Sequence, residues 1–395
     1  MSRRLTSRSA DLKRLQDEGF EVEVHGGYLV VGHVPYVTDD RTVRYGRLVS
    51  ELTLSGDVTA APSTHVVHFS GSTPCDHEGR PLEQIINTRS PRLLADGLPV
   101  DFDFSSKPPS GGYADYYEKM STYAAILSAH AQAIDPGATA KTFPVVTCEP
   151  EDDSVFRYLD TASSRAGISA VTQQLERNRV AIVGLGGTGA YILDLVAKTP
   201  VREIHLFDGD RFLQHNAFRS PGAATVEDLR GGPQKVDYLA AMYGKMRRGI
   251  IPHSVYLDEA NVAELRGMDF VFLSIDRGPA RKLVVHALEE YGIAFVDVGM
   301  GVYEGDGSLA GLVRVTTSTP EQRAHVHAMG RIPFGDEDEN NEYARNIQIA
   351  DLNAVNAALA VIKWKKFCGF YADLEHEHHS VYQIDGNVLT NEDTT

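Results

Sequence analysis

The sequence predicts an α/β fold: a Rossmann-like, doubly wound, mostly parallel sheet, preceded by a smaller N-terminal β-rich α+β domain. Two observations predict it. From residue 151 onward, short apolar runs alternate with segments that have the length and apolar spacing of helices, which is the pattern of a doubly wound sheet. Before residue 150, apolar residues alternate with period two between Gly, Pro and Asp, which is typical of antiparallel strands.

We place the domain boundary near residue 150. The chain has 395 residues, a length that favours two domains. The stretch TCEPEDDS is short, acidic and contains Pro, as connecting segments often do. We therefore expect an N-terminal domain over residues 1–150, with a role in partner binding, and a second domain over residues 151–395.

Three segments of the N-terminal domain indicate its secondary structure. Residues 12–70 contain the alternating runs FEVEVHGGYLVVGHVPYV, GRLVSELTLSGDV and THVVHFSG, so we expect short strands there. Residues 87–112 are rich in Pro, Ser and Gly, which favours a loop. Residues 113–134 carry apolar side chains at helical spacing and end before Asp-Pro-Gly, which predicts one helix.

The second domain is predicted to begin with a helix and then to alternate strands and helices. Short apolar runs predict the strands, and longer amphipathic segments predict the helices between them. The predicted strands are 179–184, 203–208, 269–275 and 293–299, and the predicted helices are 162–177 and segments within 190–199, 234–246, 279–292 and 349–370. The last of these helices is expected to pack against the sheet or a partner. Residues 379–389 predict a final strand or hairpin, and residues 390–395 a frayed end.

Composition excludes several functional classes. The formal net charge is −16, which argues against nucleic-acid binding, because phosphate contacts need a basic face. No run of about 20 apolar residues occurs, so no membrane span is expected, and the basic N-terminus lacks the apolar core of a secretory signal. The three cysteines, Cys75, Cys148 and Cys368, are far apart and odd in number. We therefore expect a reducing, cytoplasmic location.

A glycine-rich turn indicates a nucleotide site. Gly184, Gly186, Gly187 and Gly189 form G-L-G-G-T-G between a predicted strand and a predicted helix. Such glycines allow a tight turn, and the N–H groups at the start of the helix can bind a phosphate or carboxylate. Asp208 ends the next strand, where an acidic side chain can accept hydrogen bonds from ribose hydroxyls. This pairing does not separate NAD from ATP.

The residues that follow favour a triphosphate. Asn216 and Arg219 come shortly after the acidic strand end, Lys235 begins a helix, and Asp276 ends a buried strand with Arg281 five residues later. A dinucleotide does not need an extra Asn, Arg and Lys from separate loops, whereas a triphosphate does, because charge must be neutralised while pyrophosphate leaves. An Asp beside phosphates is also a natural magnesium ligand.

Taken together, these motifs resemble the ThiF-type adenylating domain of the ubiquitin-activating enzyme superfamily over roughly residues 155–370. The elements are the glycine loop, the D-x-D of Asp208 and Asp210, the N-x-x-R, the lysine helix and the Asp with its later Arg. The resemblance implies ATP and Mg²⁺ as cofactors. It assigns the ribose to Asp208, the phosphates to Asn216, Arg219 and Lys235, and magnesium to Asp276.

The resemblance also implies a homodimer. Family members carry an Arg, in a helix before the first strand, that acts on the partner's ATP, and Arg165 lies at a matching distance. The usual Arg-Gln pair is Arg165-Ala166 here, and Ser220 replaces the usual Gln after the N-x-x-R arginine.

Two departures from the family pattern concern metal and thiol chemistry. The chain has no C-x-x-C, so the structural zinc of many relatives is not expected. No cysteine occurs between Gly299 and Asn346, where ubiquitin-activating enzymes place their thioester cysteine. Cys368 is expected to be a buried apolar residue, and Cys148 is not expected to be a nucleophile. We therefore expect the enzyme to stop at an acyl adenylate, or to pass the acyl group to a thiol on another protein.

Other polar clusters receive ordinary interpretations. The acidic run FGDEDENNE at 334–342 predicts a mobile loop, at the position of the crossover loop that, in relatives, covers the tail of the bound small protein. Two histidine-rich groups are interpreted as ordinary polar residues rather than metal sites. His65, His68, Cys75 and His77 are expected in a strand and loop, and His376, His378 and His379 in a solvated polar turn.

The expected function is ATP-dependent adenylation of the C-terminal carboxylate of a small ubiquitin-like protein, for transfer to a conjugating enzyme or another acceptor. The N-terminal domain faintly resembles one found in bacterial ThiF-type proteins encoded near such carriers. Three alternatives stay open: an NAD-dependent oxidoreductase, a non-catalytic scaffold that binds a partner, and adenylation of a small-molecule, peptide or RNA-linked carboxylate.

Overall fold

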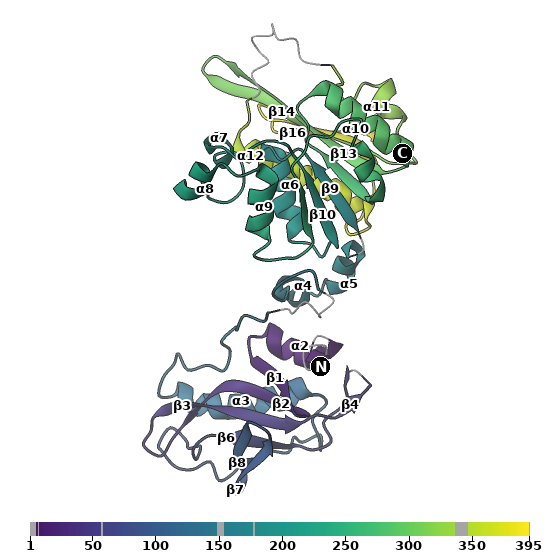
Figure 1. The fold of residues 1–395 in the computed structure, drawn as a ribbon. Helices are drawn as coiled ribbons and strands as arrows, with labels where there is room; N and C mark the ends of the chain where they lie inside the picture. Colours follow the sequence, from purple (N-terminus) through teal and green to yellow (C-terminus); the bar gives the residue numbers. More distant parts are fainter. Residues whose placement is uncertain are drawn as a thin grey trace. The chain divides into compact units, whose positions relative to one another are not determined.

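The structure is a computed structural model that describes residues 5–6, 8–56, 58–147, 154–176, 178–335 and 347–394. The chain divides into two compact units, Met1–Val146 and Thr147–Thr395 (Figure 1). Across the described residues, no helix combines the length and the apolar character that a membrane span requires.

The first unit is an antiparallel sheet of six strands in the order β1-β2-β3-β6-β8-β7. Helix α3 carries Tyr116, Met120, Tyr123 and Leu127, which are buried at helical spacing and pack in the main core of this unit. Its elements are α2 (Ala10–Asp17), β1 (Glu21–His25), β2 (Tyr28–Val37), β3 (Val43–Glu51), β4 (Leu54–Ser55), β5 (Val58–Thr59), β6 (Val66–Ser70), β7 (Ile86–Ala95), β8 (Leu98–Ser105) and α3 (Tyr116–Gln132).

The prediction of a loop over residues 87–112 is wrong for its first half. Residues 86–105 form the antiparallel hairpin β7–β8, joined by a turn in which Gly97 has φ +73°. Buried residues alternate along β8, at Leu98, Val100, Phe102 and Phe104. The Asp-Gly turn and this alternation are a hairpin signal, which the Ser and Pro content of the segment obscured.

The second unit is built on an eight-stranded sheet in the order β11-β10-β9-β12-β13-β14-β15-β16. The strands from β11 to β13 run parallel, and β14, β15 and β16 continue the sheet antiparallel. This confirms the predicted Rossmann-like, mostly parallel sheet with a β-rich domain before it. The strands are β9 (Arg179–Val183), β10 (Glu203–Phe207), β11 (Ile250–His253), β12 (Phe270–Leu273), β13 (Ala294–Gly305), β14 (Ser308–Ser318), β15 (Glu377–Gln383) and β16 (Val388–Thr394).

Helices cover both faces of this sheet. Apolar side chains of α6, α9 and α12 share one core with β9 and β10, and those of η2, α10 and α11 share a second core on the other face. The helices are α4 (Thr161–Arg165), α5 (Ser169–Thr172), η1 (Gln173–Leu175), α6 (Gly187–Ala197), α7 (Gln214–Ala217), α8 (Val226–Gly231), α9 (Lys235–Tyr243), η2 (Val262–Gly267), α10 (Gly278–Tyr291), α11 (Ala324–Ala328) and α12 (Ala350–Phe367). The predicted late helix is α12, and it packs against the sheet and α6.

Two expectations for the second unit are wrong. The helix predicted over 162–177 is broken into α4, α5 and η1, because Gly167 has φ +70° and ends the first helix. The Gly167 N–H donates to the Ser164 carbonyl, and the Ile168 N–H donates to the Ser163 carbonyl. The predicted frayed end at 390–395 is the strand β16 as far as Thr394, which pairs with β15. Arg331 holds it through ion pairs with Glu392 and Asp393.

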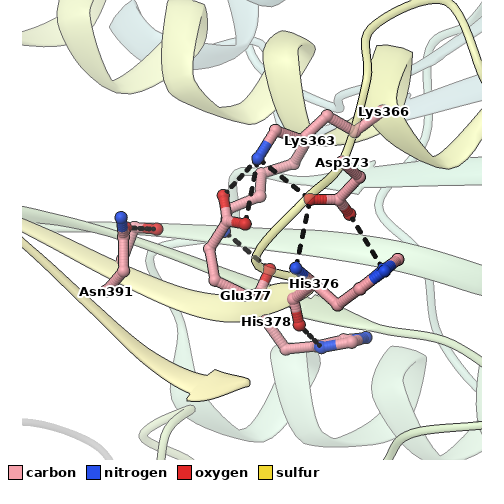
Figure 2. Close-up of polar contacts among 8 residues, drawn as sticks. Lys363, Lys366, Asp373, His376, Glu377, His378 and Asn391 are labelled. Carbon is pink, nitrogen blue, oxygen red and sulfur yellow. Dashed lines mark hydrogen bonds and ion pairs between the residues drawn. The ribbon is translucent and has the colours of Figure 1, made fainter. Parts of the chain in front are cut away.

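The C-terminal end of α12 is fixed to β15 by a cluster of ion pairs, which we call the α12–β15 clamp (Lys363, Lys366, Asp373 and Glu377). Figure 2 shows both lysines reaching Glu377. Lys363 Nζ lies 3.0 Å, and Lys366 Nζ 2.8 Å, from Glu377 Oε1, and Lys366 Nζ lies 3.1 Å from Asp373 Oδ1. Burial of Glu377 opposes its ionisation, but hydrogen bonds from Lys366 and Lys363 outweigh it and lower the Glu377 pKa to about 2.

Candidate active site

The glycine loop joins β9 to α6 at the carboxyl edge of the sheet. Gly184 has φ +86°, and a Cβ there would lie 2.2 Å from the carbonyl oxygen of Ser274 at the end of β12. A Cβ at Gly189 would lie 1.9 Å from the Gly184 oxygen. Gly186 is the N-cap of α6 and provides no capping side chain. The first N–H groups of α6 therefore have no side-chain acceptor and can bind an anion.

Asp208 fixes the glycine loop from the next strand. It follows β10 directly and is only 7% exposed. Its Oδ2 accepts a hydrogen bond from the Leu185 N–H at 2.7 Å, and its Oδ1 accepts one from the Asp210 N–H at 2.8 Å. Gly184 N–H donates to the Phe207 carbonyl at 2.8 Å. The Asp208 carboxylate thus holds both the glycine loop, through Leu185, and the loop after β10, through Asp210.

Lys235 joins the same cluster from the start of α9. Its Nζ lies 2.7 Å from Asp210 Oδ2 and 3.5 Å from Asp208 Oδ2, and its backbone N–H donates to the Asp210 carbonyl at 2.9 Å. Burial of Asp210 opposes its ionisation, but hydrogen bonds from Lys235 and Tyr256 outweigh it and lower the Asp210 pKa. The structure thus brings together three of the predicted site residues beside the glycine loop.

Tyr256 and Arg277 also lie here, and neither is among the site residues predicted from the sequence. The Tyr256 hydroxyl is hydrogen bonded to Asp210, and a Cβ at Gly209 would lie 2.6 Å from the Tyr256 ring. The Arg277 guanidinium is 5.6 Å from the centroid of that ring. Both residues follow strand ends at the edge that carries the glycine loop, and this position is the signal that could have identified them.

Asn216 and Arg219 lie on and just after α7. Asn216 is 2% exposed, and its Oδ1 accepts a hydrogen bond from the Leu213 N–H at 2.8 Å, so its amide nitrogen is the group that remains to donate. The Nε of Arg219 is buried and has no hydrogen-bond partner among the described residues. Since a buried N–H without an acceptor is costly, this atom suits an anionic ligand.

Asp276 lies between β12 and α10, two residues after the Ser274 that contacts Gly184. It is exposed and makes no hydrogen bond or ion pair with any residue that the structure describes. Arg281 donates a hydrogen bond to the carbonyl of Ile275, the residue before Asp276, and another to the Pro333 carbonyl at 3.0 Å. Within the described ranges, no cluster of three or more His, Cys, Asp or Glu side chains forms a metal site.

The remaining candidates belong to other elements or lie outside the described residues. Arg165 is the exposed last residue of α4. Cys148 and residues 336–342 of the acidic run lie outside the described residues. Burial raises the pKa of the Cys368 thiol to about 12, so this thiol is a poor nucleophile. His65 and His68 bind different partners, Ser105 and Asp103.

A Rossmann-like sheet with a glycine loop and an acid at the next strand end defines a nucleotide-binding protein. The chain belongs to the ThiF family, which matches residues 160–387, more than half of its length. Residues 10–161 match a second family, described as a domain of unknown function, DUF6791.

Several solved structures resemble the chain, whereas no curated protein matches it. E. coli MccB with ATP is 17% identical, with a TM-score of 0.41, over 57% of this chain and 66% of that one. The microcin C7 biosynthetic enzyme MccB in complex with N-formylated MccA is 19% identical, with a TM-score of 0.44, over 59% and 69% of the two chains. PaaA is 16% identical, with a TM-score of 0.43, over 57% and 75%.

Proposed function

We propose that this protein uses ATP to adenylate the C-terminal carboxylate of a small ubiquitin-like protein and releases pyrophosphate. One observation carries the proposal: Lys235 lies between Asp208 and Asp210 directly beside the glycine loop. A cation at that point can neutralise phosphate charge, while the carboxylate that braces the loop is placed for a ribose.

The roles of the nucleotide-binding residues follow from their contacts. The first turn of α6 would hold a phosphate through its N–H groups. Asp208 would accept a ribose hydroxyl on a lone pair that its two backbone donors leave available. Lys235 would exchange Asp210 for a phosphate oxygen, and the buried Arg219 Nε and the Asn216 amide nitrogen would donate to phosphates as well. Asp210 would orient Lys235 for this exchange.

The residues also fit a magnesium ion, with Asp276 as its protein ligand. Magnesium in nucleotide sites commonly takes one or two carboxylates together with phosphate oxygens and waters. Asp276 is an exposed carboxylate after the carboxyl end of β12, with no partner among the described residues. When bound, the ion would neutralise charge on the phosphates. Structural zinc is not part of the proposal.

The reaction is a displacement at the α-phosphorus. A carboxylate oxygen of the acceptor forms a bond to this phosphorus, the bond to the bridging oxygen of the β-phosphate breaks, and pyrophosphate leaves with the electron pair. Arg219 and Lys235 neutralise the growing charge on the leaving group and hold the reacting groups in line. We propose that the protein is a homodimer and that the partner's Arg165 adds a further cation.

The acceptor is a partner with a free C-terminal tail. We propose that the product passes to a conjugating enzyme or another acceptor, because the one described cysteine in the second unit has a raised pKa. The N-terminal unit, with its own sheet and core, would bind such a partner. Adenylation of a peptide or small-molecule carboxylate uses the same chemistry and is an outcome of the test.

ATP–pyrophosphate exchange tests the proposal. The protein is incubated with ATP, labelled pyrophosphate and candidate ubiquitin-like proteins encoded beside it, each with a free or an amidated C-terminus. We expect label to enter ATP only with a free carboxylate. If exchange occurs with a short peptide or a small carboxylic acid but with no ubiquitin-like protein, the acceptor is a peptide or a small molecule instead. Binding of NAD in place of ATP would contradict the proposal, and no exchange with any acceptor would favour a scaffold.

A further inference from the structure

Asn353 is a buried side chain on α12 that contacts the glycine loop from 165 residues away along the chain. It is completely buried. Its Oδ1 accepts a hydrogen bond from the Thr188 hydroxyl at 2.9 Å, and its Nδ2 donates to the Arg219 carbonyl at 3.3 Å. Because a carbonyl can only accept, the atom that faces Arg219 must be the amide nitrogen, which fixes the orientation of the amide.

The same amide fills the space beside Gly187. A Cβ at Gly187 would lie 1.9 Å from Asn353 Nδ2 and 2.5 Å from its Cγ. No side chain at position 187 can therefore coexist with Asn353 in its present place. By contrast, Cβ atoms at Gly184 and Gly189 would meet main-chain carbonyl groups, so the Gly187 contact is the one that a single side-chain truncation can relieve.

The two hydrogen bonds join segments that come from different loops. Thr188 lies in the first turn of α6, where N–H groups without a capping side chain can bind an anion. Arg219 carries the buried Nε that has no hydrogen-bond partner in the described part of the chain. An amide that holds both segments sets the separation between these two groups of donors. A shift of about 1 Å between positioned groups can reduce the rate of a reaction by about a hundredfold.

We propose that Asn353 is a positioning residue that fixes Arg219 relative to the N-terminus of α6, and that Gly187 is required because this amide occupies the space beside it. The inference rests on the proposed function, since ATP is the ligand whose phosphates both segments would contact. Asn353 itself touches neither nucleotide nor acceptor.

The test compares three variants of the full chain: Asn353→Ala, Gly187→Ala and the double variant. ATP affinity is measured by calorimetry and the midpoint of thermal unfolding by circular dichroism. We expect Asn353→Ala to weaken ATP binding about fivefold and Gly187→Ala at least tenfold. The double variant should bind ATP more tightly than Gly187→Ala alone, because the truncated side chain leaves room for the new methyl group.

Asn356→Ala is the matched control. Asn356 lies one turn further along α12, is 1% exposed and donates to the Gly299 carbonyl of β13 at 3.0 Å rather than to Arg219. It should lower the unfolding midpoint as much as Asn353→Ala while leaving ATP affinity unchanged. Asn353→Ser is a milder variant, used if Asn353→Ala does not fold; its hydroxyl keeps a polar atom in the space and should weaken ATP binding less.

Each outcome is decisive. If the wild type binds ATP and Asn353→Ala binds it equally well, Asn353 only stabilises the fold and the inference is wrong. If the double variant binds ATP no better than Gly187→Ala, the steric relation between the two residues is wrong. If the wild type binds no ATP, the proposed function fails and the inference fails with it. This outcome is distinguishable from the other two, because in both of those the wild type binds ATP.

Discussion

Asp276 has no hydrogen-bond or ion-pair partner among the described residues, so its removal should cost little stability. We expect Asp276→Ala to abolish acceptor-dependent pyrophosphate exchange, because the magnesium ligand is lost where charge develops. The unfolding midpoint should change by less than about 2 °C, as for other surface substitutions. Exchange near the wild-type rate would refute the assignment of magnesium to Asp276.

Lys119 contrasts with the exposed Asp276, because it is a buried cation. It is fully buried in α3, its Nζ donates to Ser50 Oγ at 2.8 Å, and burial lowers its pKa from 10.5 to about 8, with Glu51 opposing. Below pH 8 the ammonium is charged in both folded and unfolded chains, and its full burial cost is present. We expect Lys119→Met to stabilise the first unit at pH 7 by about 1–3 kcal/mol. This gain should shrink between pH 8 and 10.5, as the folded wild type loses its proton first.

Denaturant titrations of wild type and Lys119→Met at pH 7, 9 and 10.5 measure this gain directly. A variant that is less stable than the wild type at pH 7 would show that Lys119 stabilises the fold as the ammonium. A difference that does not depend on pH would contradict the lowered pKa of Lys119. The matched variant Ser50→Ala, which removes only the hydrogen-bond acceptor, should destabilise the protein most at pH 7.

Among the elements of the second unit, α12 contacts the start of α6 with its first turn and β15 with its last turns. Asn353 in its first turn reaches the glycine loop, and Lys363 and Lys366 near its end form the α12–β15 clamp (Figure 2). Asn353 and Lys363 are ten residues apart, or about 15 Å along a helix. The clamp thus fixes the helix that carries the amide beside the glycine loop.

The clamp should make stability depend on acid pH. The Glu377 pKa falls from 4.5 to about 2 in the folded state, so its contribution is complete above pH 4.5 and is lost as the pH falls toward 2. We expect Glu377→Gln to lower the free energy of unfolding at pH 7 by roughly 3 kcal/mol, since it leaves a buried lysine unpaired. The difference from wild type should shrink below pH 4.5 in chemical denaturation. Asp373→Asn, at a more exposed pair, should have a smaller effect; an equal effect would contradict this account of the clamp.

The elements predicted correctly are those whose residues carry a local signal. The buried strands at Val180–Val183 and Phe270–Leu273 are continuous apolar runs, and Asp208 and Lys235 follow from their places at a strand end and a helix start. Gly167 broke a helix that composition alone favoured. Asn353 could not be selected, because its importance comes from contacts across the fold rather than from a spacing within the sequence.

At the scale of the whole molecule, the proposed homodimer can be tested by mixing subunits. Arg165→Ala and Lys235→Ala homodimers should each be nearly inactive in pyrophosphate exchange. Mixed dimers should recover one working site, formed by Arg165 of one chain and Lys235 of the other, because charge on the leaving pyrophosphate grows in the transition state. Subunit exchange is verified with differently tagged chains. Verified exchange without recovered activity would mean that Arg165 does not act across the interface.

Transfer of AMP from ATP to a carboxylate is the central claim, and labelling the α-phosphate of ATP tests it most directly. The full chain is incubated with a ubiquitin-like protein and ATP labelled at the α- or the γ-phosphate, and acid-quenched protein is analysed for label. The account predicts that label from the α-phosphate, and none from the γ-phosphate, appears on the acceptor. This labelling should need a free C-terminal carboxylate and be lost in Lys235→Ala. Label from the γ-phosphate, or α-label that persists after the C-terminus is amidated, would contradict it.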